Sequence, residues 1–265
     1  MLAHRMLEAA AHRRSSSGTL WTPSLLTTLA WFDADDASTL TVSGSSISQW
    51  NDKSGNGYNA TQTTGSAQPQ LASSSFGSLP AVNFATASQF LYVPSIPQVS
   101  GQTVFAVLDT TSLGTGYVLL MERNAASASN MAIYLGGTST YGAADYTPWI
   151  YWNAAGYGVL TANRKKSLLS FNYSTSGGAA TVNNTQDGAL TPITSTGSAS
   201  ALTTWRSING AAGVQSSTFK IAEVIVLNSI SSTDKQKMEG YLAWKWGING
   251  NLPAGHPYKS APPYL

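Results

Sequence analysis

The C-terminal third of the chain constrains the fold most, because a strand pattern there runs directly into a helix pattern. Residues 219–228, FKIAEVIVLN, alternate in polarity and are rich in β-branched side chains, which is typical of a half-buried strand. Residues 231–247 begin with Ser-Ser-Thr-Asp and end at Gly247, which predicts a capped helix. Met238, Tyr241, Leu242 and Trp246 recur at helical spacing and form its apolar face. We therefore expect a strand followed by a short helix that packs on a β domain.

Short apolar runs separated by turn residues fill the rest of the chain from Leu20 onward. The runs predicted as strands are 81–84, 90–93, 103–108, 117–121, 131–135, 149–152, 166–173, 178–182 and 219–227. Such spacing indicates an all-β fold, an antiparallel β-sandwich with a short C-terminal helix. Residues 186–200, rich in Ser, Thr, Ala and Gly, predict a long exposed loop. No internal repeat or second globular domain is visible, so we assign residues 19–265 to one domain.

Residues 1–18 predict a separate N-terminal anchoring arm, an amphipathic helix followed by a flexible Ser/Gly joint. The arm carries the excess positive charge of a chain whose net charge is +2. The residues expected to anchor it to a partner are Leu2, Arg5, Met6, Leu7, Arg13 and Arg14. The alternative is a helix folded back on its own domain.

Several classes of function are disfavoured by composition. The body of the chain is electroneutral, which argues against a nucleic-acid partner. No apolar run is long enough to span a membrane, and no secretory signal is present, so we expect neither membrane insertion nor export by that route. Cysteine is absent, and the histidines, His4, His12 and His256, lie near the termini. A thiolate or histidine metal site and a catalytic triad are therefore unsupported.

Four stretches carry a resemblance to a known family. They are residues 31–36 (WFDADD), residues 47–62 with the turn DKSGNG, residues 241–247 (YLAWKWG) and residues 252–263. Together they resemble the concanavalin A-like, laminin-G-like jelly-roll domains of bacteriophage virion proteins over about residues 19–262. The resemblance implies a jelly roll in which the turn follows an early strand and the last strand and helix close the sandwich. Lectins, glycanases and structural modules all use this fold.

Glycan cleavage requires two suitably spaced carboxylates. Concanavalin A-like glucanases typically present them as Glu-x-Asp-x-x-Glu, and this pattern is missing here. The glutamates Glu8, Glu122, Glu223 and Glu239 are far apart in sequence. We expect structural roles for them, with Glu122 in an ion pair, Glu223 in the closing strand and Glu239 in the helix. The sequence therefore predicts a protein that is not an enzyme and has no catalytic residues.

The candidates for a calcium site are oxygen-bearing residues near the N-terminal end of the domain. They are Asp33, Asp36, Asp52 and Asn56, with Asp35, Ser54 and Gly57 beside them. Hard oxygen ligands in a Gly-containing turn suit calcium. The same residue types also form tight turns through local hydrogen bonds, and the EF-hand-like spacing lacks the acidic residue at its twelfth position. We favour the turn and expect no cofactor, with calcium as the alternative.

An aromatic run marks the middle of the chain. Tyr146, Trp149, Tyr151 and Trp152 are the candidates for glycan binding, since flat rings stack on sugar faces. A packed core or a subunit interface would use the same residue types. Alternation along a strand places Trp149 and Tyr151 on one face and Trp152 on the other.

These patterns lead to a prediction of a non-enzymatic phage virion structural protein. It would be a capsid decoration, head fibre or tail component that displays a lectin-like jelly roll and is anchored by its N-terminal arm. The expected partners are other virion proteins and further copies of the chain, and the expected location is the virion, assembled in the host cytoplasm. The alternative is an adhesin that binds a host surface glycan, and a third possibility is a glycoside hydrolase or lyase.

Overall fold

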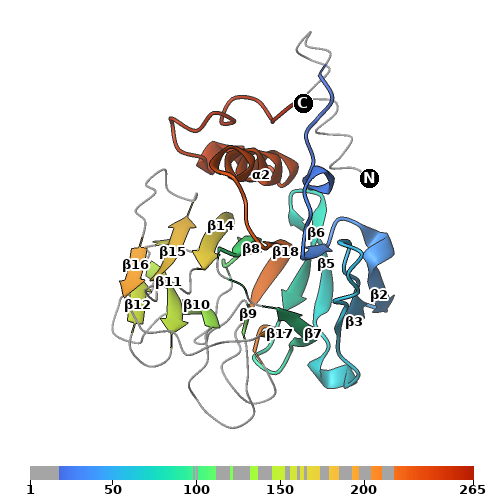
Figure 1. The fold of residues 1–265 in the computed structure, drawn as a ribbon. Helices are drawn as coiled ribbons and strands as arrows, with labels where there is room; N and C mark the ends of the chain where they lie inside the picture. The colour runs from blue at the N-terminus through green and yellow to red at the C-terminus, as the bar shows by residue number, and fades with distance from the viewer. Residues whose placement is uncertain are drawn as a thin grey trace.

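The computed structural model describes residues 18–97, 99, 101–111, 209–210 and 218–265, together with the strands that lie between residues 120 and 208. Within those intervening strands, side chains are described for residues 166–170 and 207–208. This part of the chain forms an antiparallel β-sandwich with one α-helix against its outside (Figure 1). The predicted fold class is confirmed, whereas the predicted N-terminal arm, residues 1–18, lies outside the described residues except for Gly18.

One layer of the sandwich lies beneath the helix, and we call it the helix-side layer. Its strands are β1 (Ala30–Asp33), β6 (Leu79–Phe84), β8 (Thr103–Asp109), β14 (Lys166–Tyr173), β15 (Ala179–Asn184), β16 (Ile193–Thr196) and β18 (Phe219–Leu227). Strand β18 is central, because it pairs with β8 along one edge and with β1 and β6 along the other. Strands β14, β15 and β16 continue the layer beyond β8.

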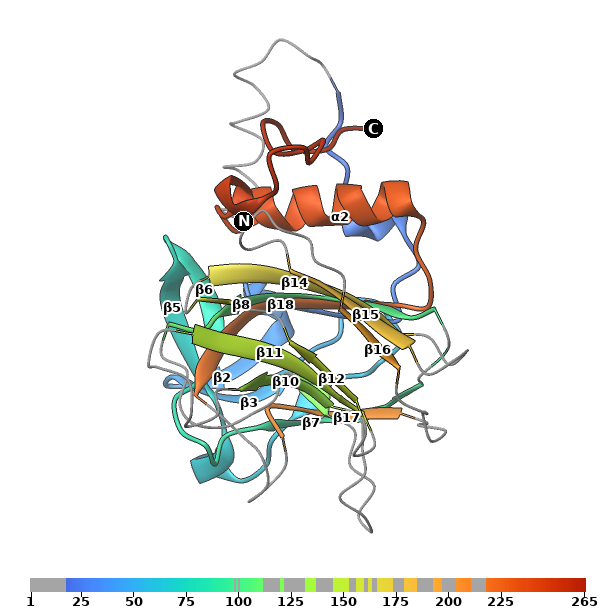
Figure 2. The same cartoon turned by 90° about the vertical axis from the view of Figure 1, so that its left-hand side faces the viewer.

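The second layer lies on the side away from the helix, and we call it the opposite layer (Figure 2). Its strands are β2 (Leu40–Ser43), β3 (Ser46–Trp50), β4 (Ala60–Thr61), β7 (Leu91–Pro97), β17 (Thr204–Ile208), β9 (Leu120–Met121), β10 (Ala132–Gly136), β11 (Asp145–Trp152) and β12 (Gly156–Val159). They pair in this order. Strand β13 (Ala162–Asn163) pairs with the start of β11, and β5 (Gln70–Phe76) connects β6 to β3. The two layers therefore belong to one curled sheet.

Alternation along the strands of the helix-side layer creates two apolar cores. On β8, Val104, Ala106 and Leu108 lie between the layers, where they join Phe32 and Trp50. The intervening Phe105 and Val107 lie on the other face and pack against the helix. This layer is thus buried on both faces, which explains why all seven residues of β8 are buried.

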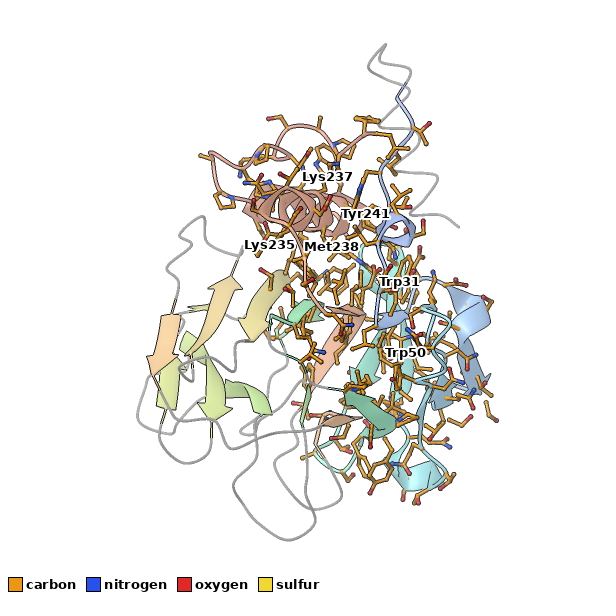
Figure 3. All side chains as sticks on the ribbon, in the orientation of Figure 1. Trp31, Trp50, Lys235, Lys237, Met238 and Tyr241 are labelled. Carbon is orange, nitrogen blue, oxygen red and sulfur yellow. The ribbon has the colours of Figure 1, made fainter. Side chains whose placement is uncertain are left out.

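Helix α2 (Ser232–Lys245) follows β18 as predicted. The hydroxyl of Ser231 accepts a hydrogen bond from the backbone N–H of Asp234, 3.0 Å away, and so caps the first turn. Gly247 has φ of +67°, the left-handed conformation expected after a helix end. Figure 3 shows Met238 and Tyr241 on α2, and both side chains are buried in the core that the helix shares with the sheet.

The C-terminal tail covers the other side of α2. The indole N–H of Trp244 donates to the carbonyl of Tyr258 at 2.8 Å, which attaches the tail to the helix. The tail then reaches the start of the domain, where Leu20 pairs with Tyr264 and Trp21 N–H donates to the carbonyl of Pro263 at 3.0 Å.

Short 3-10 helices occupy Pro23–Leu25, Ala37–Thr39, Gly65–Ala67 and Asn249–Asn251. In the part of the chain described, no helix is long and apolar enough to cross a membrane.

The predicted strands are confirmed in the residues that the structure describes, which for the run 117–121 are Leu120 and Met121. The loop predicted at residues 186–200 contains β16, which pairs with β15. Strands β1 to β5, β12, β13 and β17 were also absent from the predicted runs. The β2–β3 hairpin shows why, because its residues are mostly exposed or half-buried and the turn residue Gly44 interrupts a short polar run. Pairing with neighbouring strands, rather than side-chain burial, defines such strands.

Candidate functional site

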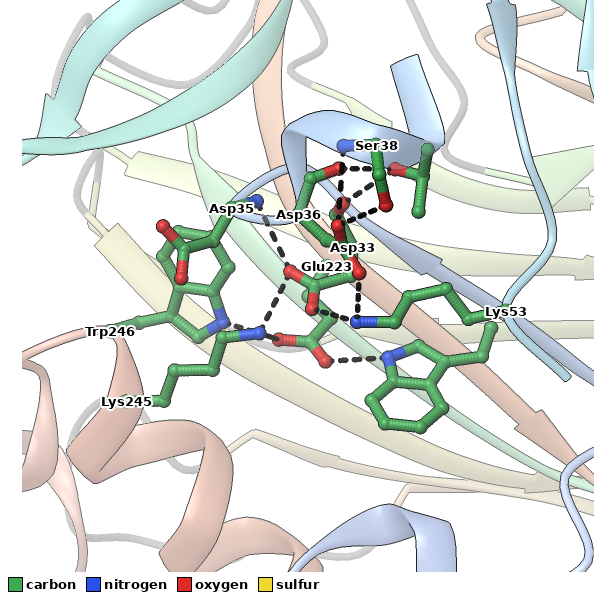
Figure 4. A network of polar contacts seen from close by, with 10 residues as sticks. Asp33, Asp35, Asp36, Ser38, Lys53, Glu223, Lys245 and Trp246 are labelled. Atoms are coloured by element: carbon green, nitrogen blue, oxygen red, sulfur yellow. Dashed lines mark hydrogen bonds and ion pairs between the residues drawn. The ribbon is translucent and has the colours of Figure 1, made fainter. Parts of the chain in front are cut away.

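A network of charged side chains lies between α2 and the helix-side layer (Figure 4). Lys245 Nζ is 2.7 Å from Asp33 Oδ1 and 2.8 Å from Glu223 Oε2. Lys53 Nζ is 2.8 Å from Asp33 Oδ2 and 2.9 Å from Asp36 Oδ2. We call these five residues the Lys245 network. It connects α2, β18, β1 and the segment after β3.

A β-bulge in β18 directs Glu223 toward the helix. Ile221 lies opposite Leu108 of β8, but the next paired residue, Glu223, lies opposite Val107. The extra residue, Ala222, belongs to the core under α2, as do the contacts of Glu223. Two consecutive residues therefore face the helix, which is the arrangement a bulge produces.

Two tryptophans complete the surroundings of Glu223. The indole N–H groups of Trp31 and Trp246 each donate to its carboxylate at 2.7 Å, one to each oxygen. The side chain of Glu223 has no exposed surface, and those of Asp33 and Lys245 are each 6% exposed. A polymer outside the protein cannot reach these carboxylates, so the network acts as an internal brace between helix and sheet.

The charges of the network influence one another strongly. Burial favours a raised pKa for Asp33, but the charges of Lys245 and Lys53 outweigh it and hold that pKa below its ordinary value. For Glu223, burial and the nearby Asp33 charge raise the pKa, against the opposing effects of Lys245 and Trp246. Burial would lower the pKa of Lys245, yet Glu223 and Asp33 raise it, so the ammonium stays charged.

The DKSGNG turn, residues 52–57, packs against β1. Asp52 Oδ1 accepts from the backbone N–H groups of Trp31 and Ser54, both at 2.9 Å, and Oδ2 accepts from Ser54 Oγ at 2.7 Å and Tyr58 N–H at 3.1 Å. Asn56 Nδ2 donates to the carbonyl of Leu29 at 2.9 Å. The polar atoms of this turn therefore bond protein groups.

The four calcium candidates divide between these two features. Asp33 and Asp36 bind Lys53, whereas Asp52 and Asn56 form the turn. Within the described ranges, no three histidine, cysteine, aspartate or glutamate side chains gather into a group that could hold a metal ion. The contacts of Asp33 and Asp36 are ion pairs with Lys53, and those of Asp52 and Asn56 are hydrogen bonds with the backbone of the turn and of the segment before it.

Glu239 of α2 forms a second buried network. It accepts from Ser170 Oγ of β14 at 3.0 Å, is paired with Lys235 one turn earlier, and lies 3.3 Å from His256 Nε2 of the tail. Burial favours a higher pKa for Glu239, but the His256 hydrogen bond and the Lys235 charge outweigh it and lower that pKa. Glu239 thus connects sheet, helix and tail.

The outer face of the opposite layer carries an exposed aromatic ring that the sequence analysis did not single out. Tyr92 of β7 is 49% exposed, whereas its neighbours Leu91 and Val93 belong to the core between the layers. The ring of Phe90 meets that of Tyr92 edge-on, with centroids 4.8 Å apart and planes at 87°.

Uncharged polar residues lie beside Tyr92 in the sheet. Thr61 of β4 is directly opposite Tyr92, and Gln49 of β3 is directly opposite Thr61. Residues directly opposite in an antiparallel pair lie on the same face. This face therefore offers an aromatic ring, a hydroxyl and an amide, the groups that bind sugars by stacking and hydrogen bonding.

The predicted glycan-binding residues Tyr146, Trp149, Tyr151 and Trp152 all lie on β11, which pairs with β10 and β12. Their side chains are outside the described part of the structure. The anchoring residues Leu2, Arg5, Met6, Leu7, Arg13 and Arg14, and also Glu122, lie outside the described residues altogether.

Comparison with known proteins gives matches in structure only. No family model matches the chain, and no curated protein matches its sequence. Domain 4 of AbnA, a GH43 extracellular arabinanase from Geobacillus stearothermophilus in complex with arabinotriose, has 13% identity and a TM-score of 0.50, over 76% of this chain and 91% of that one. An arabinofuranosidase complexed with arabinofuranosyl-α-1,2-xylobiose has 14% identity and a TM-score of 0.53, over 92% and 61%. Trypanosoma rangeli sialidase has 11% identity and a TM-score of 0.54, over 91% and 38%.

These matches correct the functional prediction. The predicted non-enzymatic phage virion structural protein is wrong, because the structural neighbours are glycoside hydrolases and none of these three is a virion protein. The prediction that the chain is not an enzyme is overturned by the same finding. At 11–14% identity the likeness itself shows the fold, an antiparallel β-sandwich. The chain spans 61% of the arabinofuranosidase and 38% of the sialidase.

Proposed function

We propose that this chain is a carbohydrate-active β-sandwich domain that binds polysaccharide through the outer face of its opposite layer. The domain would belong to a glycoside hydrolase and bind the polysaccharide on which that enzyme acts. The finer assignment to the concanavalin A-like, laminin-G-like class belongs to this proposal. It is supported by the turn at residues 52–57, which packs against an early strand, and by β18 and α2, which close the helix-side layer.

The exposed ring of Tyr92 carries the proposal. Burying a tyrosine in the core is favourable, so a ring that remains 49% exposed on a sheet face has surface available for a ligand. Thr61 and Gln49 beside it supply a hydroxyl and an amide without a charge. The helix-side face cannot serve in the same way, because α2 and the tail cover it.

The structural neighbours support the choice of ligand class. The arabinanase domain, of which this chain covers 91%, was determined with arabinotriose, and the arabinofuranosidase with an arabinofuranosyl xylobiose. This chain covers most of a separate domain but a smaller share of two larger enzymes. Such coverage is what we expect of a module within a larger carbohydrate-active protein. We therefore place arabinan, xylan and arabinoxylan first among the ligands to test.

Affinity electrophoresis in gels that contain these polysaccharides tests the proposal. The wild-type chain should be retarded by at least one of them, and Tyr92→Ala should lose most of the retardation while keeping its thermal unfolding temperature. Leu25→Ala is the matched control, since Leu25 is 53% exposed in the segment that leads into β1. A wild-type chain that no polysaccharide retards, or a Tyr92→Ala chain that is retarded as strongly as wild type, contradicts the proposal.

A further inference from the structure

Tyr92 belongs to a row of residues that crosses four strands, and the inference drawn from this row rests on the proposed function. Thr41 of β2 lies opposite Gln49 of β3. Gln49 lies opposite Thr61 of β4, and Thr61 lies opposite Tyr92 of β7. Residues directly opposite one another share a face of the sheet. We call these four residues, Thr41, Gln49, Thr61 and Tyr92, the Tyr92 row.

The neighbours of the Tyr92 row show that it faces outward. Trp50, Ala60 and Val93 each stand next to a member of the row along their strand, and all three are buried in the core between the layers. Successive residues of a strand alternate between faces, so the row lies on the face away from that core. Every member of the row is accordingly exposed or half-buried.

The polar groups of the row are available to a ligand. Within the residues that the structure describes, the hydroxyls of Thr41, Thr61 and Tyr92 form no hydrogen bond with a protein group. Gln49 Nε2 donates to Asn51 Oδ1, which holds the amide in place and leaves its own carbonyl oxygen as an acceptor. The row therefore presents hydroxyls and an oriented amide beside an exposed aromatic ring.

The surroundings of the row favour a neutral ligand. Strands β2, β3, β4 and β7 contain no charged residue. An acidic sugar or a phosphate would find no opposite charge on these strands. The hydroxyls of a neutral sugar both donate and accept hydrogen bonds, which matches the hydroxyl and amide groups of the row.

The accessible polar groups extend from Tyr92 in one direction only. Along the chain, the residues two positions from Tyr92 are Phe90 and Pro94, which have no polar side-chain atom. Across the sheet on the other side, Ser207 of β17 lies opposite Tyr92 but is 2% exposed, so protein atoms already cover it. A ligand that stacks on Tyr92 therefore finds its hydrogen-bond partners toward β2.

The length of the row limits the size of the ligand. From β7 to β2 it crosses three interstrand steps, which at about 4.8 Å each amount to about 14 Å. A sugar ring is about as wide as one step of ~4.8 Å, so the row offers about one position per strand.

We propose that the Tyr92 row binds a short segment of a neutral polysaccharide, about four sugar residues long, that lies across the strands. One sugar ring stacks on Tyr92. Thr61 and Gln49 form hydrogen bonds with the hydroxyls of the next sugars, and Thr41 contacts the far end of the segment on β2.

Isothermal titration of the full chain tests the length of the site. The ligands are size-defined oligosaccharides of the polysaccharide that retards the chain in affinity electrophoresis. Affinity should rise from the disaccharide to the tetrasaccharide and should be the same for the tetrasaccharide and the hexasaccharide. Affinity that is already maximal with the disaccharide, or that still rises between the tetrasaccharide and the hexasaccharide, contradicts the inference.

Variants that remove one hydroxyl test the position of the ligand. Thr61→Val and Thr41→Val keep the branched shape of the side chain, and each should weaken tetrasaccharide binding about three- to tenfold, the value of one hydrogen bond. Thr41→Val should leave disaccharide binding unchanged, because a disaccharide on Tyr92 does not reach β2. Thr233→Val is the matched control, since Thr233 is exposed in the first turn of α2 on the helix side and its loss should not affect binding.

These outcomes separate the inference from the proposed function. If Tyr92→Ala loses binding but Thr61→Val and Thr41→Val bind the tetrasaccharide as wild type does, the row is wrong and the proposed function stands. If the wild type binds no polysaccharide, both fail. The unfolding temperature of each variant shows that it is folded.

Discussion

Gly240 of α2 lies directly against Tyr258 of the C-terminal tail. A Cβ atom at position 240 would be 2.5 Å from the Cβ and 2.8 Å from the Cγ of Tyr258, closer than such atoms approach. The absence of a side chain therefore lets the tail lie on the helix, and the Trp244 hydrogen bond to the Tyr258 carbonyl holds it there. Helix α2 is consequently covered on both sides, by the sheet and by the tail.

Gly240→Ala should destabilise the domain by about 1–3 kcal/mol, because overpacking at the tail outweighs the helix propensity of alanine. Chemical denaturation measures the change. Gly250→Ala is the matched control, since no atom lies within 4 Å of a Cβ built there. Equal stabilities for the Gly240→Ala chain and the wild type would show that the tail does not pack on the helix in this way.

Lys245→Met should lower the free energy of unfolding by about 3–5 kcal/mol, because it leaves the buried carboxylate of Glu223 without its cation. Adding Glu223→Gln to this variant should recover part of the loss, since the uncompensated charge is then removed. A double-mutant cycle from urea denaturation gives the coupling between the two residues. A coupling near zero would contradict the brace.

Stability should fall as the pH decreases from about 4 to about 2. The pKa of Asp36 is lowered to about 2, because its bonds to Ser38 and Lys53 outweigh burial, and the pKa values of Asp33 and Glu239 are lowered too. An acid with a lowered folded pKa stabilises the fold above its unfolded pKa, and this contribution is lost as the pH falls through the folded pKa. Glu223, whose pKa is raised, acts in the opposite direction. Urea denaturation at about pH 4, 3 and 2 measures the trend, and a free energy of unfolding that rises as the pH falls over this range would contradict it.

Asp52→Ala should cost about 2 kcal/mol or more, because the backbone N–H groups of Trp31, Ser54 and Tyr58 lose their acceptor. Thermal unfolding of the wild type and of the variant measures this loss. The same measurement on the wild type, with and without calcium, tests for a metal site. The wild-type unfolding temperature should be the same in calcium and in chelator. A clear rise with calcium would restore the metal interpretation of this turn.

The sequence predicted those parts of the fold in which burial and local geometry agree. In α2 the period of the apolar residues matches the structure, and Ser231 and Gly247 occupy the two ends of the helix as expected. The strand β18 was predicted as well, but it is buried on both faces rather than half-buried. The polar strands β2, β16 and β17 were missed, because pairing partners far away in sequence define them. The bulge at Ala222 was equally invisible, since it appears only in the register with β8.

The candidate site was also predicted only in part, because its residues come from strands that are far apart in sequence. The sequence indicated that β11 has two different aromatic faces but could not determine which one lies outside. The structure describes β11 by its backbone pairing alone, so the assignment of Tyr146, Trp149, Tyr151 and Trp152 to glycan binding stays a prediction. Tyr92 itself was part of a predicted strand, and its exposure follows only when the buried partners of that strand are known.

Polysaccharide binding by the wild-type chain and by Tyr92→Ala, compared at equal thermal stability, tests the role of this sheet face most directly. We expect the wild type to bind a neutral polysaccharide and the variant to lose about three- to tenfold in affinity. Identical affinities for the two folded proteins would contradict the claim that this sheet face is the binding surface.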